Sequence, residues 1–212
     1  MKKILLQIPK NIYLLLSIIL FSFVVPVMDN DHLKYFLHEI SYSIMLLSIF
    51  SIIDKKTQFL KYLLIISISN IWINSFFIDN KIIHYFTYSF STIVLVITTG
   101  IMIHQIVSSK SITAKVIIET ICGYLLLGII LFFLNSIVLW HNPNAIEFKT
   151  EGYRISSMIY YSYITITTIG YGEILPISPA ARSLSILFGV ISQLYLALIV
   201  AFILGKFVNK TN

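Results

Sequence analysis

The sequence predicts an all-α membrane protein with six transmembrane helices. Its 212 residues are 58% hydrophobic and only 11% charged, and the mean hydropathy is +0.90. A soluble domain carries about twice that share of charged residues. The apolar residues also fall in runs long enough to cross a hydrocarbon core of roughly 30 Å. These observations leave little room for a domain outside the membrane.

The apolar runs define six predicted spans, joined mostly by short polar connections. The spans are Ile12–Met28, Tyr35–Ile53, Tyr62–Ile78, Ile82–Val107, Val116–Trp140 and Leu184–Val208. The first run follows two lysines but lacks a small-residue cleavage site, so it is interpreted as an uncleaved helix. The connection between the fifth and sixth spans, Trp140–Ser183, is far longer than the others and holds the residues of chemical interest.

Basic residues are distributed unequally between the two sides of the membrane. With a cytoplasmic N-terminus, the outer side holds Lys34, Lys81, Lys149, Arg154 and Arg182. The inner side holds the other ten of the fifteen, Lys2, Lys3, Lys10, Lys55, Lys56, Lys61, Lys110, Lys115, Lys206 and Lys210. Because basic residues favour the cytoplasmic side, both termini are predicted to lie in the cytoplasm of a cell-membrane protein. The basic residues are scattered singly, so no nucleic-acid partner is expected.

The long connection contains the string Thr168-Ile169-Gly170-Tyr171-Gly172-Glu173. Successive backbone carbonyls can all point to one axis only if the signs of the dihedral angles alternate. Glycine adopts positive φ at little cost, which accounts for Gly170 and Gly172. Ile169 and Tyr171 are then expected to point away from the axis and to hold the backbone in place. One such strand supplies a quarter of a ring of oxygens, so four chains would be needed.

The residues on either side of this string are interpreted as its supports. A short re-entrant helix is predicted over about Arg154–Ile166, with its partially negative C-terminal end directed at a cation in mid-membrane. Such a segment is tolerated only where it is buried in protein or lines water. After the string, Pro176 and Pro179 exclude an immediate helix.

Five side chains are candidates for supporting the string: Tyr160, Tyr161, Thr167, Glu173 and Arg182. The two tyrosines are expected to pack around Tyr171, in the same or a neighbouring chain. Arg182 is expected to open the last helix and to pair with Glu173. As an exposed ion pair, it would contribute little stability.

This stretch resembles the pore domain of the potassium-channel superfamily. The resemblance covers about Ile112–Val208, and the segment Tyr160–Leu184, continuing into Gln193–Ala197, looks like small prokaryotic channels of that superfamily. It implies a homotetrameric channel for K⁺ with a pore helix, a selectivity filter and no other cofactor. K⁺ would bind at Thr168, Ile169, Gly170 and Tyr171, and Thr168 would add a hydroxyl oxygen at the inner mouth. In such channels, carbonyl oxygens replace the ion's hydration shell.

The chain departs from this family pattern at three places. Glu173 follows the filter where most relatives have aspartate, and Ile164 stands where some relatives place a carboxylate behind the filter. Ser192 occupies the position of a frequent hinge glycine in the last helix, and Gly189 lies one turn earlier. Gly189 and Ser192 are therefore both hinge candidates.

The predicted domains are a four-helix N-terminal membrane domain, residues 1–110, and a pore domain, residues 111–212. The fourth span contains no Arg or Lys, and its only histidines are His84 and His104. A voltage sensor needs charges that move through the field, at about 2.3 kcal/mol per charge per 100 mV. Conventional voltage gating is therefore not expected, although the six-span layout matches that of voltage-gated channels in number.

Four residues of the last span recur at helical spacing: Gln193, Leu196, Val200 and Leu204. They are candidates to line an inner cavity, and the apolar ones could close it by dewetting. In the alternative interpretation, the three apolar residues pack against the fifth helix or lipid.

Other polar residues receive conservative interpretations. His38 and Glu39 could form an outer proton or metal site, or an interfacial hydrogen-bonded pair. Glu119 is expected to pair with Lys115 or to extend to the membrane surface. Cys122 is expected to be a buried, inert thiol.

An enzyme is not expected, because the sequence lacks paired intramembrane carboxylates, a Cys/His ligand set and a nucleotide-binding loop. Two other functions stay open. One is a weakly selective cation channel or a subunit that works only with a partner. The other is a non-conducting membrane scaffold or sensor, whose uncharged first helices would dock on an unidentified regulatory protein.

Overall fold

The computed structural model describes residues 11–28, 31–52, 58–77, 80–109, 111–149 and 154–211. The elements, in chain order, are α1 (Asn11–Ile19), η1 (Leu20–Val24), η2 (Val25–Val27), α2 (Asp31–Ile52), α3 (Gln58–Phe76), α4 (Lys81–Ser108), α5 (Ala114–His141), β1 (Ile146–Phe148), α6 (Arg154–Ile166), β2 (Ile174–Pro176) and α7 (Pro179–Thr211). The predicted inner residues Lys2, Lys3, Lys10, Lys55, Lys56 and Lys110 lie outside the described residues, as do the side chains of Leu204 and Lys210.

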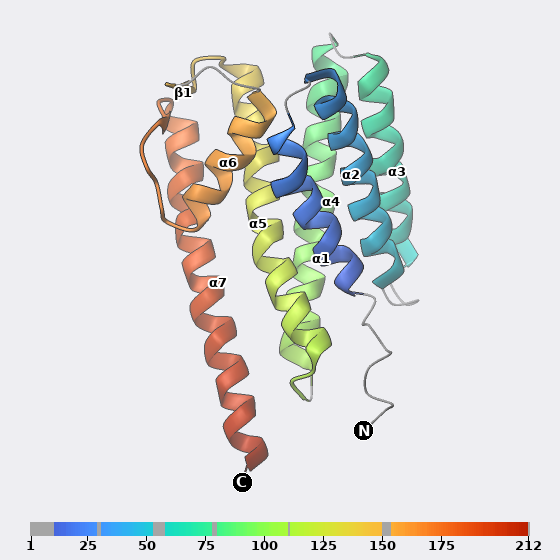
Figure 1. The fold of residues 1–212 in the computed structure, drawn as a ribbon, viewed down its shortest axis with the longest axis vertical. Helices are drawn as coiled ribbons and strands as arrows, with labels where there is room; N and C mark the ends of the chain where they lie inside the picture. Colours follow the sequence, from blue (N-terminus) through green and yellow to red (C-terminus); the bar gives the residue numbers. More distant parts are fainter. Residues whose placement is uncertain are drawn as a thin grey trace.

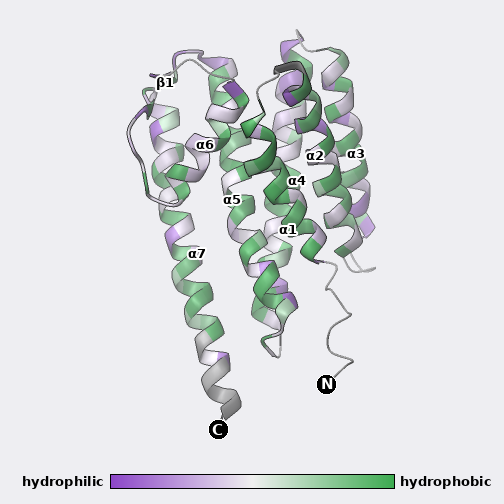
Figure 2. Ribbon diagram, viewed as in Figure 1, coloured by the Kyte–Doolittle hydropathy of each residue, from purple (hydrophilic) through white to green (hydrophobic). Residues whose placement is uncertain are grey.

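Five helices in the described ranges are long and apolar enough to cross a membrane. These stretches are Leu33–Ile52, Gln58–Phe76, Lys81–Ser108, Ala114–His141 and Pro179–Ile203, which coincide with the second to sixth predicted spans. The first predicted span corresponds to the shorter apolar stretch Asn11–Val27. Figure 2 shows hydrophobic residues over the middle of the long helices and hydrophilic residues gathered towards their ends.

The first apolar stretch changes its helical geometry along its length. It begins as α-helix, continues as the π-helical η1 and ends as the 3₁₀-helical η2, which contains Pro26. Proline has no backbone N–H and cannot continue an α-helical hydrogen-bond ladder. The end of this segment, η2, contacts both α2 and α6.

The helices form a bundle with α7 at one side (Figure 1). α5 lies in the middle, α1 to α4 pack on one side of it, and α6 lies between α5 and α7. The main buried core includes Leu14, Leu46, Leu95 and Leu126, from α1, α2, α4 and α5. It therefore extends across the boundary predicted between residues 110 and 111.

The helix starts of α4 and α5 are capped by polar side chains. The Asn80 side chain accepts hydrogen bonds from the backbone of Ile82 and Ile83, and the Thr113 hydroxyl accepts one from Val116. Such caps satisfy backbone donors that have no partner within the helix. They extend both helices beyond the predicted apolar runs, and Lys81 becomes the first residue of α4.

Candidate functional site

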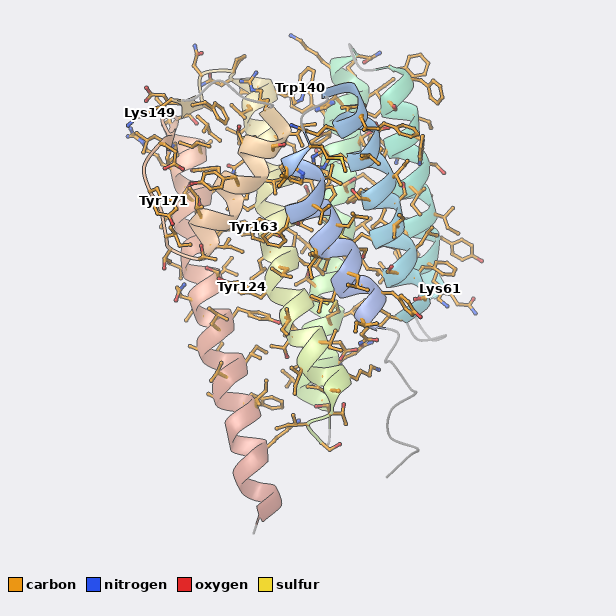
Figure 3. The ribbon with its side chains drawn as sticks, viewed as in Figure 1. Lys61, Tyr124, Trp140, Lys149, Tyr163 and Tyr171 are labelled. Carbon is orange, nitrogen blue, oxygen red and sulfur yellow. The ribbon has the colours of Figure 1, made fainter. Side chains whose placement is uncertain are left out.

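The short helix α6 has the bounds predicted for the pore helix, Arg154–Ile166. Its buried residues are mostly apolar or aromatic and pack against α5 and α7. Tyr163, labelled in Figure 3, anchors it. The Tyr163 hydroxyl donates a hydrogen bond to the Leu125 carbonyl (3.0 Å) and lies 2.9 Å from the Ser22 hydroxyl. α6 is therefore fixed both to α5 and to η1, the π-helical part of the first apolar stretch.

Gly128 of α5 makes room for the Tyr163 ring. A Cβ atom at this position would lie 2.7 Å from a ring carbon of Tyr163, closer than real Cβ contacts. The end of the first apolar stretch adds a further contact, since the Ser156 hydroxyl donates to the Pro26 carbonyl. The surface on which α6 packs is therefore formed by residues from both predicted domains.

The last four carbonyl groups of α6 all have hydrogen-bond partners, although a helix end leaves such groups without intrahelical donors. Two contacts come from other helices: the Ser192 hydroxyl of α7 (2.7 Å) and the Tyr124 hydroxyl of α5 (3.1 Å) both donate to the Ile166 carbonyl. The remaining bonds come from the chain that follows, and are Thr167 N to Tyr163 O, Thr168 N to Thr165 O, and Ile169 N and Gly170 N to Ile164 O.

The segment after α6 has the alternating backbone predicted from the glycine spacing. φ is positive at Thr168 (58°), Gly170 (51°) and Gly172 (89°) and at none of the other described residues. Positive φ was expected at the two glycines but not at Thr168, where a β-branched side chain makes it costly. The intervening Ile169 and Tyr171 are 53% and 74% exposed in the single chain.

The supporting threonines bond to nearby backbone. The Thr167 hydroxyl donates to the Tyr163 carbonyl and the Thr168 hydroxyl to the Thr167 carbonyl, both at 2.7 Å. Thr167 therefore reinforces the end of α6, and Thr168 does the same for the turn that follows.

The C-terminal end of the segment is held by a two-stranded antiparallel ribbon that was not predicted from the sequence. β1 pairs with β2, with Glu147 opposite Leu175. Lys149, which follows β1, donates from its backbone N–H to the Glu173 carbonyl and from Nζ to the Gly172 carbonyl, both at 3.1 Å. Figure 3 shows Lys149 and Tyr171 on the same side of the molecule. The alternation Ile146-Glu147-Phe148 was a signal for this strand.

The side chains flanking the segment are arranged differently from the prediction. The ion pair expected between Arg182 and Glu173 is absent from the described residues: Arg182 Nε instead donates to the Pro176 carbonyl (3.1 Å). The Glu173 carboxylate instead interacts with the Tyr160 side chain. α7 begins at Pro179, three residues before Arg182.

The two tyrosines of α6 take separate roles. Tyr160 is 40% exposed and lies close enough to Tyr171 for the two side chains to interact electrostatically. The Tyr161 hydroxyl is instead 2.6 Å from the Ser185 hydroxyl of α7. Of the two, only Tyr160 is therefore directed towards the segment.

The cavity candidates on α7 lie away from α5. α7 packs against the rest of the chain through a stripe of buried residues, Phe188, Ser192, Tyr195 and Ile199. Gln193, Leu196 and Val200 are all exposed and do not belong to this stripe. In the single chain, Leu196 and Val200 are therefore not among the residues that pack on α5, and both the vestibule and the lipid interpretations of these positions stay predictions. α7 is continuous through both hinge candidates, Gly189 and Ser192.

Other polar predictions have mixed outcomes. Lys115 and Glu119 lie 3.7 Å apart, as expected, and Asn11 also donates to Glu119 (2.6 Å), a contact that was not predicted. His38 and Glu39 are buried and line a small cavity between α2, α3 and α5. The described residues contain no cluster of His, Cys, Asp or Glu that could hold a metal ion. His104 is exposed, Cys122 is buried and His84 is only 7% exposed.

Comparison with known families finds one match. The family described as ion channel matches residues 119–209, slightly less than half of the chain, from the first turns of α5 to the end of α7. No curated protein and no solved structure shows significant similarity to the chain. The matched segment contains α6 and the alternating backbone, so that the family match and the geometry fall on the same residues. The match therefore places this segment, residues 119–209, in the ion-channel pore-domain superfamily of the potassium channels.

Proposed function

We propose that the chain forms a homotetrameric, potassium-selective channel that conducts K⁺ passively across the cell membrane. The observation that carries this proposal is the alternation of φ at Thr168, Gly170 and Gly172 directly after a buried helix. With alternating φ, successive carbonyl groups can face the same side of an extended strand. A row of such carbonyls can replace the hydration shell of a potassium ion.

The proposed filter needs other copies of the chain to complete it. One chain supplies a single row of oxygens, whereas an ion in a pore must be surrounded. Ile169 and Tyr171 are exposed, as expected for side chains that pack against neighbouring chains. Four copies of Thr168–Tyr171 would supply the rings of oxygens, with K⁺ as the permeant ion and no cofactor.

The exposed side of α7 supports assembly as well. Its exposed apolar residues are Ile186, Leu187, Val190, Ile191, Leu194, Leu196, Leu198 and Val200. In the proposed tetramer, one part of this surface packs on neighbouring chains, and Gln193, Leu196, Val200 and Leu204 line the inner vestibule. The apolar members of this set would close the vestibule by dewetting.

The proposed gating is not conventional voltage sensing. Lys81 is the only Lys or Arg in α4, and it stands at the first position of the helix and is exposed. A charge at the end of a span crosses little of the membrane field, whereas a sensor needs several that cross most of it. With both termini cytoplasmic, the filter faces the outside, and a change at the inner ends of α7 or at the filter would open the pore.

The test is the reversal potential of purified protein in a planar bilayer with opposing potassium and sodium solutions. We expect reversal near the potassium equilibrium potential and loss of selective current on Gly170→Asp. Asn144→Asp introduces the same side chain in an exposed turn of the same connection and should leave the reversal potential unchanged. Robust current reversing near zero would identify a weakly selective cation channel. Silence of a well-folded protein would favour a scaffold or sensor.

A further inference from the structure

A cavity of about 400 Å³ lies beside the pore helix, at the end of the molecule that carries Trp140 (Figure 3). Its lining comes from α2, α4, α5, α6 and the turn after α5. The volume falls within the range of about 300–1,000 Å³ that is typical of small-molecule sites. None of the residues placed in the proposed filter or vestibule lines this cavity, so it is a separate feature.

The cavity has a basic rim and an apolar interior. Lys81 and Arg154, both exposed, are the first residues of α4 and α6. Phe132, Leu139 and Met158, all largely buried, form the apolar wall. None of the described residues that line the cavity is acidic. The lining therefore suits a ligand with a negatively charged end and an apolar remainder.

His84 supplies a second, independent indication of a ligand. It lines the cavity, its side chain is only 7% exposed, and neither ring nitrogen has a hydrogen-bond partner in the structure. Its ring is held between those of Tyr88 (4.1 Å between centroids) and Trp140 (4.0 Å). Buried polar groups without a partner are rare in native proteins, and a bound water, ion or ligand is one explanation for such a group. A ligand oxygen could accept a hydrogen bond from this imidazole.

The position of the cavity along the helices indicates where such a ligand comes from. Lys81 begins α4 and Trp140 lies one residue before the end of α5, both of which are long enough to cross a membrane. Tryptophan at the end of a span is typical of the headgroup level of a bilayer. The basic rim is therefore level with lipid headgroups, and the apolar wall lies deeper, level with the acyl chains.

We propose that this cavity binds an acidic phospholipid, with its phosphate at Lys81, Arg154 and His84 and the start of its acyl chain against Phe132, Leu139 and Met158. Arg154 can serve this role from a fixed position, because its guanidinium donates to the Pro143 carbonyl (3.2 Å) and lies over the Phe148 ring. The acidic side chain of Glu39 lines the adjacent small cavity instead. A bound lipid would contact α4 and α6 at once, and so would link the N-terminal helices to the pore helix.

Fluorescence quenching tests this site directly, because the chain has only two tryptophans. In a Trp72→Phe background, Trp140 at the cavity is the only tryptophan, and its fluorescence is excited selectively over that of the tyrosines. The protein is reconstituted in vesicles of one fixed mixture of phosphatidylglycerol and phosphatidylcholine. Dibrominated acyl chains are placed either on the phosphatidylglycerol or on an equal mole fraction of the phosphatidylcholine. We expect a several-fold larger quenching constant when phosphatidylglycerol carries the bromine.

Variants connect this preference to the cavity. The double variant Lys81→Gln/Arg154→Gln should reduce the preference about tenfold or more, since each cation near a membrane surface contributes roughly fivefold. The matched double variant Lys61→Gln/Lys115→Gln removes the same charge at the opposite ends of α3 and α5, and should keep the preference. His84→Phe keeps an aromatic ring but removes both nitrogens, and should lower the preference by a smaller factor. A variant that fails to elute as the parent protein does is replaced by Lys81→Gln alone.

Two outcomes would overturn the proposal. Equal quenching by the two brominated lipids would show that the cavity has no preference for an anionic headgroup. Relief of the quenching by inorganic phosphate in the buffer would show that the basic rim takes free phosphate without a lipid. Persistence of the preference in the Lys61→Gln/Lys115→Gln variant and in phosphate buffer, with its loss in Lys81→Gln/Arg154→Gln, is the result that supports a lipid site.

Discussion

The two helices on either side of α6, α5 and α7, are similar in composition but differ in how much of their surface their own chain covers. In the most apolar stretch of α5, 67% of the residues are buried within the chain, whereas in α7 the share is 22%. α5 contacts α1, α4, α6 and α7, and α7 contacts α5, α6 and the β2 strand. One chain thus completes the environment of α5 and leaves most of α7 uncovered.

This difference separates two kinds of side chain near the proposed filter. Residues that face α5 are fixed by contacts within the chain, so their roles can be tested by stability. Residues on the open faces of α7 acquire partners only from lipid, water or further copies. Mutations on the buried faces of α5 should therefore change the stability of the chain, whereas mutations on the open faces of α7 should change its association.

The largest effect is expected at Gly128 of α5. Gly128→Ala would place a Cβ atom 2.7 Å from the Tyr163 ring, which cannot withdraw because its hydroxyl is bonded to Leu125 and lies beside Ser22. Overpacking of this kind typically costs about 1–3 kcal/mol of stability. Thermal unfolding in a fixed detergent measures it. Gly100→Ala, where no atom lies within 4 Å, is the control and should be neutral or slightly stabilising. Equal midpoints for the two variants would contradict the close packing of α5.

The second effect concerns assembly through α7. Ile186→Ala/Leu194→Ala removes side chains that are 69% and 54% exposed in the single chain. In the proposed tetramer, each truncation should weaken association by about 1 kcal/mol or less, because lipid chains compete for the same surface. Light scattering of the purified protein at decreasing concentration measures this change. Phe59→Ala, a truncation at a 74% exposed residue of α3, should leave association unchanged. If both variants dissociate alike, α7 is no more involved in assembly than the outer helices.

A third effect is expected at the carbonyl of Ile166, which α5 and α7 share. Ser192→Ala and Tyr124→Phe each remove one hydrogen bond to it, and each should cost about 1 kcal/mol. The double variant leaves this carbonyl without either donor, so its cost should exceed the sum of the two. A double-mutant cycle on unfolding free energies measures the excess. Strict additivity would mean that the two hydroxyl groups stabilise α6 independently.

The smallest effect is expected at Lys149, on the exposed outer side. Lys149→Gln removes the hydrogen bond from Nζ to the Gly172 carbonyl. Its loss should destabilise this part of the segment by roughly 0.5 kcal/mol, because exposed charged contacts are weak. In the proposed channel, this appears as faster decay of current during sustained opening, most clearly at low ionic strength. In Glu147→Gln, an exposed change within the same ribbon, the current should decay at the same rate as in the parent protein. Slower decay in Lys149→Gln would show that the lysine opposes conduction instead of holding the filter.

Features that depend on local sequence could be predicted. The bounds of α6 agree with the prediction, since an aromatic-rich run ends where the Thr-Thr-x-Gly string begins. Positive φ at Gly170 and Gly172 follows from the tolerance of glycine for that region. The predicted ends of α4 and α5 were less accurate. Apolar content marks the part of a helix that lies in the hydrocarbon layer, whereas the capping residues Asn80 and Thr113 set where these helices start.

Features that depend on which of several available partners a group bonds to could not be predicted. Positive φ at Thr168 accompanies a tight turn in which the Ile164 carbonyl accepts bonds from Ile169 and Gly170. The expected pair of Arg182 and Glu173 was wrong, because Arg182 donates to the Pro176 carbonyl and Glu173 interacts with Tyr160. Sequence spacing indicates which groups could lie within bonding distance, but not which of several possible partners a group bonds to.

The ribbon of β1 and β2 also has a consequence for biogenesis. It joins the two ends of the α6 segment, and Ile177 and Ser178 both donate to the Ala145 carbonyl at its base. All of these contacts lie within one chain, so the entropic cost of closing the loop does not depend on another copy. Assembly then brings together preformed hairpins instead of loose strands. We expect the ribbon to act as an early checkpoint, whose loss would lower the yield of assembled protein more than the stability of the finished one.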